Sequence, residues 1–158
     1  MIPVPGQEWR TPEPVLLNHS WPLHELARHF ELGYILNSEA IEAVQPNAVG
    51  ALSAHHAACW ECDLADNSLT WSGGVYDIFG LQRNASITRD ECVSFYSERS
   101  RVILERLRSE AIRNRNGFTL DAEIHSVIGE TRWMRLIAAP IFEDGRTVRL
   151  QGVKLIIS

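Results

Sequence analysis

The sequence predicts an α+β fold, in which strands lie before and after a block of helices. Apolar and polar residues alternate between residues 118 and 127, as expected for a strand with one buried face. Residues 97–114 instead carry apolar residues at helical spacing, namely Ile103, Leu104, Leu107 and Ala111. Extended over residues 57–158, these two periodicities predict the order β-β-α-α-α-β-β-β.

The composition is that of a soluble globular protein with one ordinary core. The chain has 158 residues, of which 45% are hydrophobic and 22% are charged. Its net charge is -5, whereas a general nucleic-acid binder needs a surplus of positive charge. Apolar runs such as residues 136–142 are far shorter than the roughly 20 residues of a membrane helix. The odd number of cysteines argues against a disulfide framework. We therefore expect a cytoplasmic protein that binds neither nucleic acid nor membrane.

The first two predicted strands form a hairpin that is followed by two short helices. Residues 59–64 read as one strand, residues 65–68 are turn formers, and residues 69–71 return as the second strand. Residues 73–80 and 88–95 are predicted to form the short helices.

The long helix is predicted to stop at Gly117, and three strands follow it. These strands cover residues 118–127, 132–142 and 148–157, and residues 143–146 form the turn between the last two. Six arginines between residues 99 and 115 are interleaved with glutamates, which predicts a solvated helix face.

The N-terminal third, residues 1–56, is predicted to be a separate helical extension. Four prolines within residues 1–19 favour an extended arm. A helix is predicted to begin near Ser20-Trp21-Pro22, followed by a second after Ser38 that stops near Pro46 and a third over residues 47–56. The first helix has one apolar face, formed by Leu23, Leu26, Phe30 and Tyr34.

Several short motifs follow one another in a fixed order along residues 57–158. They are Trp60-Glu61-Cys62-Asp63-Leu64, Leu69-Thr70-Trp71-Ser72, Tyr76-Asp77-Ile78-Phe79-Gly80-Leu81, Gly129-Glu130-Thr131-Arg132-Trp133, and Asp144-Gly145-Arg146 before Gly152-Val153. In this order they resemble the PAS domains of the PAS-3 type. The resemblance implies a five-stranded antiparallel sheet with helices on one face and a pocket between the two layers.

The resemblance also has two departures. Many relatives carry a His-Pro-Asp-Asp-Arg-like stretch before the long helix, where this chain has residues 96–100, Tyr-Ser-Glu-Arg-Ser. Many relatives end in Asp-Ile-Thr, which couples the sheet to a following effector, and here Ile156 takes the place of that aspartate. We therefore expect either a free-standing PAS protein or a piece cut from a longer one.

The outer face of the predicted sheet is expected to be apolar. If Met134, Leu136 and Ala138 face the core, the alternate residues of that strand face outward and meet the outward residues of the last strand. Such a patch needs a cover, and the N-terminal helices are the candidate, either in the same chain or on a partner. In PAS relatives this face forms a dimer contact. The predicted interface is Trp21, Leu23, Leu26, Phe30, Tyr34, Trp133, Ile137, Val153 and Leu155.

The pocket that the resemblance implies has a predicted apolar lining. Its residues are Trp71, Tyr76, Phe79, Phe95, Leu107, Leu120, Ala122, Ile124 and Leu136. Haem-binding relatives use a histidine on the long helix, but residues 97–114 contain none, and His125 lies on a strand face with Asp121 and Glu123 that is expected to be solvated. Cys92 lies outside the sequence that light-sensing relatives use for a flavin adduct. Non-covalent binding of flavin is an alternative that the sequence leaves open, so the cofactor is unknown.

Four residues offer an alternative metal or redox site: His55, His56, Cys59 and Cys62. Residues three apart on a strand point to opposite faces, so the two thiols are expected to be core residues instead.

The sequence has no phosphate loop, nucleophile elbow or zinc-protease motif, which argues against an enzyme. We expect a non-enzymatic signalling module that forms a homodimer or binds a partner such as a sensor histidine kinase, with a small ligand in the pocket tuning that contact. The alternative is a haem- or flavin-binding sensor domain cut from a larger histidine kinase or cyclase.

Overall fold

The computed structural model describes residues 16–35 and 58–158, and the side chains of residues 31–35 are excluded from that description. In chain order the elements are β1 (Asn18–Trp21), the 3-10 turn η1 (Leu23–Glu25), α1 (Leu26–Ile35), β2 (Ala58–Asp63), β3 (Ser68–Trp71), α3 (Gly73–Phe79), α4 (Arg89–Ser94), α5 (Glu98–Asn114), β4 (Gly117–His125), β5 (Thr131–Glu143) and β6 (Arg146–Ile156). From β2 to β6 this is the predicted order. The predicted helices over residues 38–46 and 47–56 lie outside the described residues.

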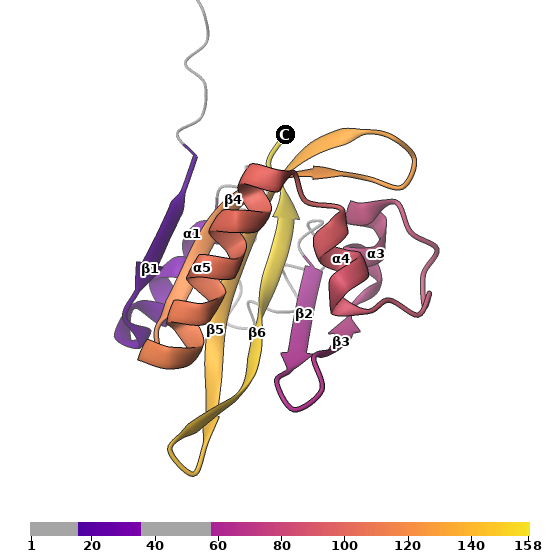
Figure 1. Cartoon of the computed structure of the whole chain (residues 1–158). Helices are drawn as coiled ribbons and strands as arrows, with labels where there is room; N and C mark the ends of the chain where they lie inside the picture. The colour runs from indigo at the N-terminus through magenta and orange to yellow at the C-terminus, as the bar shows by residue number, and fades with distance from the viewer. Residues whose placement is uncertain (1–15, 36–57) are drawn as a thin grey trace, which may run out of the picture.

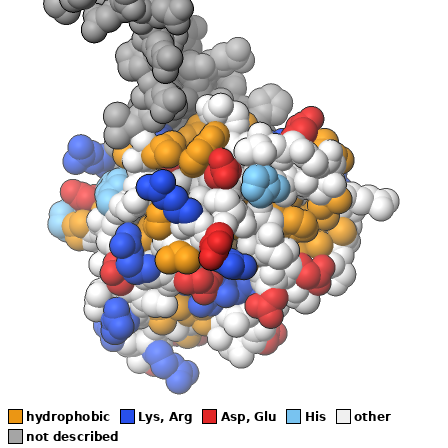
Figure 2. All heavy atoms as spheres, turned by 45° about the horizontal axis from the view of Figure 1, so that its top comes forward, with side chains coloured by type: hydrophobic (Ala, Val, Ile, Leu, Met, Phe, Trp, Pro, Cys, Tyr) orange, Lys and Arg blue, Asp and Glu red, His pale blue; other side chains and the backbone are white. Residues whose placement is uncertain are grey.

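The strands form one antiparallel sheet in the order β1-β4-β5-β6-β2-β3. Helices α3, α4 and α5 lie in front of this sheet in Figure 1, and α1 lies behind it. We call the first side the inner face and the second the outer face. No helix among the described residues is long and apolar enough to cross a membrane. On the surface shown in Figure 2, acidic and basic side chains of the described residues are interspersed.

The sheet has six strands, and the prediction of five is wrong by one edge strand. Residues 18–21 were expected to end an extended arm and open a helix, but they pair with β4, with Asn18 opposite Leu120 and Trp21 opposite Gly117. Pro22 holds an extended conformation, with φ −71° and ψ 150°, and the residue before a proline is itself biased toward extended backbone. The helical turns therefore begin only at Leu23.

The inner face carries the main core. The inward residues of β4 and β5 pack against the buried stripe of α5, which is Leu104, Leu107 and Ala111. The inward strand residues are Phe118, Leu120, Ala122, Ile124, Met134, Leu136 and Ala138. The alternation predicted for these two strands is therefore confirmed.

The outer face carries a second, smaller core, which packs against the N-terminal segment of the same chain. Its buried residues are Trp21, Ile137, Ala139, Val153 and Leu155, with Leu23, Phe30, Cys59 and Ile157 packed around them. Trp21 is 2% exposed, and its indole Nε1 donates a hydrogen bond to Oγ1 of Thr119 at 3.0 Å. The described N-terminal elements thus cover the outer face, which is one of the two arrangements that the apolar pattern left open.

Gly117 has a different role from the predicted one. The long helix ends at Asn114, and Arg115 takes the left-handed conformation, with φ 57°. Gly117 is the first residue of β4, and a Cβ atom there would clash with the ring of Trp21. Glycine at this position therefore leaves room for the indole of Trp21, which packs in the outer core.

Candidate functional site

A cavity of about 50 Å³ lies between the inner face of the sheet and helices α4 and α5. Aliphatic walls come from residues such as Leu69, Val93 and Leu104. The aromatic, basic and thiol side chains that line it are Trp60, Cys62, Trp71, Arg89, Cys92, Tyr96, Arg108, Phe118 and Lys154. The described lining residues therefore include three bases and no acid.

Lys154 lies near the C-terminal end of β6 and lines this cavity. Leu150, Gly152 and Lys154 alternate inward along the strand, whereas Val153 and Leu155 belong to the outer core. The residue is 4% exposed. Its Nζ donates to the hydroxyl of Tyr96 at 3.3 Å and lies 3.9 Å from Sγ of Cys92. Its nearest polar partners are thus neutral groups.

Four aromatic rings surround the Lys154 amine. Its Nζ lies 4.9 Å from the centroid of Phe79, 5.5 Å from Trp71, 5.6 Å from Trp60 and 5.8 Å from Tyr96. The faces of aromatic rings attract a cation at such distances, most strongly for tryptophan. The rings come from β2, β3, α3 and the link between α4 and α5, so the tertiary fold assembles this cage from distant segments.

Burial changes the acidity of the groups in the cavity. Loss of hydration lowers the pKa of Lys154, with a further lowering from Arg89 that Cys92 and Cys62 oppose. Burial raises the pKa of the Cys92 thiol and raises the pKa of Tyr96 well above its ordinary value. All three environments favour the neutral form of the side chain.

Two of the residues that line the cavity carry a buried hydrogen-bond donor that lacks an acceptor among the described residues. The donors are the indole Nε1 atoms of Trp60 and Trp71. A buried donor without a partner is costly and rare in a folded protein. Together with Lys154 they make this region rich in donors and poor in acceptors.

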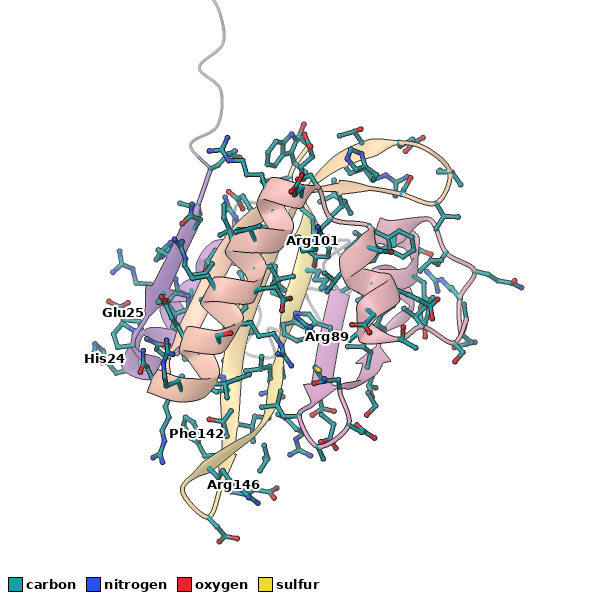
Figure 3. All side chains as sticks on the ribbon, in the orientation of Figure 1. His24, Glu25, Arg89, Arg101, Phe142 and Arg146 are labelled. Carbon is teal, nitrogen blue, oxygen red and sulfur yellow. The ribbon has the colours of Figure 1, made fainter. Side chains whose placement is uncertain are left out.

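The two arginines at the cavity differ in their partners. Arg89 of α4 forms an ion pair with Glu105 of α5, which joins the two helices. Arg108 donates to Oδ1 of Asn67 at 3.0 Å, a neutral acceptor. Figure 3 shows Arg89 between α5 and β2. The arginine stripe of α5 was predicted to be solvated, but Arg108 also faces the cavity, which is a correction to that prediction.

A wider cleft of about 620 Å³ adjoins the cavity. It lies between the β2–β3 turn, with Asp66 and Asn67, and the loop that leads into α4. Leu69, Trp71 and Arg89 line both the cleft and the cavity, so they form the partition between the two.

The predicted pocket residues are dispersed over the inner core. Trp71 and Leu136 line the cavity, Phe79 lies under the Lys154 amine, and Tyr76 lines the wider cleft. The others pack within the main core: Phe95, Leu107, Leu120, Ala122 and Ile124. Contact of any of them with a ligand stays a prediction.

The residues that the sequence did not single out are Lys154, Tyr96, Arg89 and Trp60. One signal was present: Lys154 is the only lysine of the chain, and it interrupts a run of apolar residues at an inward position of the last strand. The alternation that predicted the face of Val153 and Leu155 also predicts that Lys154 faces the core.

The described cavity does not fit haem or flavin. Its volume of about 50 Å³ is far below the roughly 300–1,000 Å³ of typical pockets for organic ligands and cofactors. The described lining contains no histidine to ligate a haem iron, and Cys92 contacts the Lys154 amine.

The two cysteines of β2 lie on opposite faces of the sheet. Cys59 packs against the outer core and Cys62 belongs to the inner one, and burial raises the pKa of both thiols. This geometry prevents the pair from holding one metal ion. His55 and His56 lie outside the described residues.

The predicted interface residues are mostly covered by their own chain. Trp21, Ile137, Val153 and Leu155 are buried together, and Leu23 and Phe30 pack against them. Leu26 is 42% exposed on α1 and Trp133 is half-buried, whereas the side chain of Tyr34 lies outside the description. Dimerisation through this surface stays a prediction.

The sequence of this chain matches the family model of the PAS fold (PAS_3) over residues 68–154. The structure is similar to that of a sensory box histidine kinase/response regulator from Burkholderia thailandensis E264, with 15% identity, 68% of this chain and 81% of that chain covered, and a TM-score of 0.59. It is also similar to the N-terminal domain of a diguanylate cyclase with a PAS/PAC sensor from Marinobacter aquaeolei, with 12% identity, 65% and 95% covered, and a TM-score of 0.60.

A PAS domain from Colwellia psychrerythraea is 17% identical, with 68% of this chain and 92% of that chain covered and a TM-score of 0.56. At these identities the likeness concerns the fold. No curated protein matches the chain. Because the family model spans more than half of the sequence, the chain belongs to the PAS fold family.

Proposed function

We propose that this chain is a sensory PAS module that works by protein–protein contact. Its input site is the cavity at Lys154, and its output surface is the outer face with β1 and α1. The extension over residues 1–56 and the PAS domain over residues 57–158 then act together, because the extension supplies one strand of the sheet. No catalytic step belongs to this proposal.

One observation carries the proposal: strand β6 contributes to both sites through consecutive residues. Lys154 lines the cavity, and its neighbours Val153 and Leu155 lie in the outer core with Trp21. Close-packed residues on one strand cannot move independently. A ligand that displaces Lys154 therefore changes the packing beneath the N-terminal segment, which is a population shift between two arrangements.

The outer face also has a polar link to the N-terminal segment. Leu155 is opposite Arg135 in the sheet, and Arg135 forms a two-pronged ion pair with Asp121 at 2.7 and 2.8 Å. The second oxygen of Asp121 accepts the backbone N–H of Leu17 at 2.9 Å. A shift of β6 thus reaches the residue that precedes β1 through three contacts.

Hydrogen exchange of the full chain tests this coupling. Lys154→Met changes the cavity, and we expect the exchange rates of the amides in residues 18–21 to change about five-fold, which corresponds to ~1 kcal/mol of local opening free energy. Arg149→Met is the matched control, since it removes a cation from the same strand where Arg149 pairs with Glu61. Equal exchange at residues 18–21 in all three proteins would contradict the proposal.

The partner class is tested separately. Fold relatives include a domain of a histidine kinase and a domain of a cyclase, and we propose a homodimer or a contact with such a signalling protein. Leu26→Asp with Phe30→Asp places two charges on α1, and sedimentation velocity reports the mass. A dimer in the wild type that dissociates in the variant supports self-association. An unchanged mass in a folded variant removes this surface as the dimer contact.

A further inference from the structure

Resting on the sensory function just proposed, we propose that the cavity at Lys154 binds a small oxygen-bearing monoanion of carboxylate size. The anion pairs with the Lys154 ammonium and accepts hydrogen bonds from the donors around it. The argument has four parts, which are charge, hydrogen bonding, size and access.

The charge of Lys154 lacks a partner. The amine is 4% exposed, and its polar neighbours are the Tyr96 hydroxyl and the Cys92 thiol. Aromatic faces attract an ammonium, but they do not replace its lost hydration. A buried lysine in such surroundings either gives up its proton or takes a counter-ion. Arg108 adds a second positive group that donates to the neutral amide oxygen of Asn67, so an anion is favoured over a cation or a neutral molecule.

The hydrogen-bond donors of the residues that line the cavity need an acceptor. The indole N–H groups of Trp60 and Trp71 are buried without a partner among the described residues. Tyr96 accepts a hydrogen bond from Lys154, which leaves its own hydroxyl hydrogen to donate. Each oxygen of a carboxylate has two lone pairs, so one small oxyanion serves several of these donors.

The size of the cavity limits the ligand. A volume of about 50 Å³ holds roughly three to five water molecules at about 10–15 Å³ each. Acetate or another anion with about four non-hydrogen atoms fits this space. Leu69, Val93 and Leu104 supply an apolar wall for a methyl group. A dicarboxylate or an aromatic acid is too large for the cavity.

The wider cleft gives access. It shares Leu69, Trp71 and Arg89 with the cavity, so an anion that enters the cleft meets a guanidinium before it reaches Lys154. The groups that face the ammonium from the surrounding elements are Cys62, Arg89, Cys92, Tyr96 and Arg108. Burial raises the pKa of the two thiols and of the phenol, which favours their neutral forms.

Because Lys154 is the only lysine of the chain, it can be observed alone. The full chain is grown with ¹³C-labelled lysine, and the single Cε signal is titrated with pH in buffers of constant ionic strength. Sodium acetate, sodium nitrate and sodium chloride are compared as probes. We expect acetate to shift the signal saturably and to raise the pKa of Lys154 by about one unit, which is a tenfold preference for the charged form. Nitrate in place of acetate would identify an inorganic oxyanion as the source.

Two variants complete the test. Lys154→Met is expected to abolish acetate binding as measured by calorimetry while the protein stays folded, and Arg149→Met is expected to retain it. A Cε signal that moves equally with acetate, nitrate and chloride reports screening alone and overturns the proposal. A signal that none of the salts moves overturns it as well.

The two proposals fail in different ways. If acetate binds at Lys154 but leaves hydrogen exchange at residues 18–21 unchanged, the anion site stands and the sensory function fails. If no anion binds but Lys154→Met still alters exchange at residues 18–21, the coupling stands and the anion site fails.

Discussion

The two faces of the sheet each bury a basic side chain, but only the one on the outer face has an oppositely charged partner. On the outer face, Arg135 is paired with the buried carboxylate of Asp121. On the inner face, Lys154 meets rings, a hydroxyl and a thiol. These residues lie on neighbouring strands, with Leu136 opposite Lys154 and Leu155 opposite Arg135. A buried basic group that is paired with a carboxylate fits a structural role. A buried basic group without such a partner instead indicates a binding site for a ligand.

The largest effect is expected from breaking the outer pair. Asp121→Asn leaves Arg135 buried without a carboxylate, and removing one partner of a buried ion pair costs about 3–5 kcal/mol. Urea unfolding of the variant measures the loss. Asp90→Asn is the control, because Asp90 is exposed at the start of α4. A loss below about 1 kcal/mol would mean that the outer face tolerates an unpaired charge too, and the contrast between the faces would disappear.

Removing the inner charge is expected to act in the opposite direction. Lys154→Met keeps the length of the side chain and removes the buried amine, which stabilises the fold by about 1–3 kcal/mol at pH 7. A more stable variant that has lost a function is the signature of a functional residue. Thermal unfolding in anion-free buffer measures the effect. Destabilisation of Lys154→Met would show that the four aromatic rings fully compensate the ammonium for its lost hydration.

The same charge predicts a dependence on pH. The folded state lowers the pKa of Lys154, so between that pKa and the ordinary value of about 10.4 the unfolded chain binds more protons. Stability from this group is fully present above pH 10.4 and is lost as pH falls through the folded pKa. The difference in unfolding free energy between Lys154→Met and the wild type should therefore shrink as pH rises from 7 to 10. A constant difference would contradict the lowered pKa.

An effect of similar size to that of Lys154→Met, but of opposite sign, is expected where the N-terminal segment meets the sheet. Gly117→Ala places a Cβ against the Trp21 ring, and an overpacked core of this kind loses about 1–3 kcal/mol. The double variant with Trp21→Leu relieves the clash, so the two losses should not add. Denaturant unfolding of the single and double variants measures this coupling. Additive losses would show that Trp21 and Gly117 act independently.

The smallest effect concerns His19 of β1. Partial burial, together with the electrostatic interaction with His29, lowers the pKa of His19, while Glu25 and Asp121 oppose this. Its contribution to stability is present above the ordinary pKa of about 6.5 and is lost as pH falls through the lowered value. The wild type should therefore lose more protection at residues 18–21 between pH 7 and pH 5.5 than His19→Gln. Equal loss in both proteins would place the pH response elsewhere.

The alternation of β4, β5 and β6 was predictable because it is a local property of the sequence. The inward set of β4, from Phe118 to Ile124, and the inward set of β5, around Leu136, needed no knowledge of partners. The same reasoning placed Asp121 on a solvated face, and this is wrong: its side chain is fully buried, because β1 adds to the sheet beside it. Only His125, at the end of that face, is exposed.

The candidate site was less predictable. A pattern along one strand shows that Lys154 faces inward, but the rings around it come from residues 60, 71, 79 and 96. Their distances from the amine depend on the packing of α3 and α4 against the sheet. The sequence also could not show that the groups nearest to the lysine are neutral, since acidic residues such as Asp90 and Glu91 lie close to Cys92 in the chain and are exposed in the fold.

By itself the sequence determined the fold family, the order of the elements from β2 to β6 and the face on which the residues of β4, β5 and β6 lie, because these follow from short motifs and periodicity. The tertiary structure decided the rest. In the folded chain a sixth strand joins the sheet, and the chain's own N-terminal segment covers the outer face. Aromatic rings surround the only lysine of the chain. The physical reason is that burial and pairing of charge depend on residues far apart in the chain, which only the assembled sheet and its helices bring together.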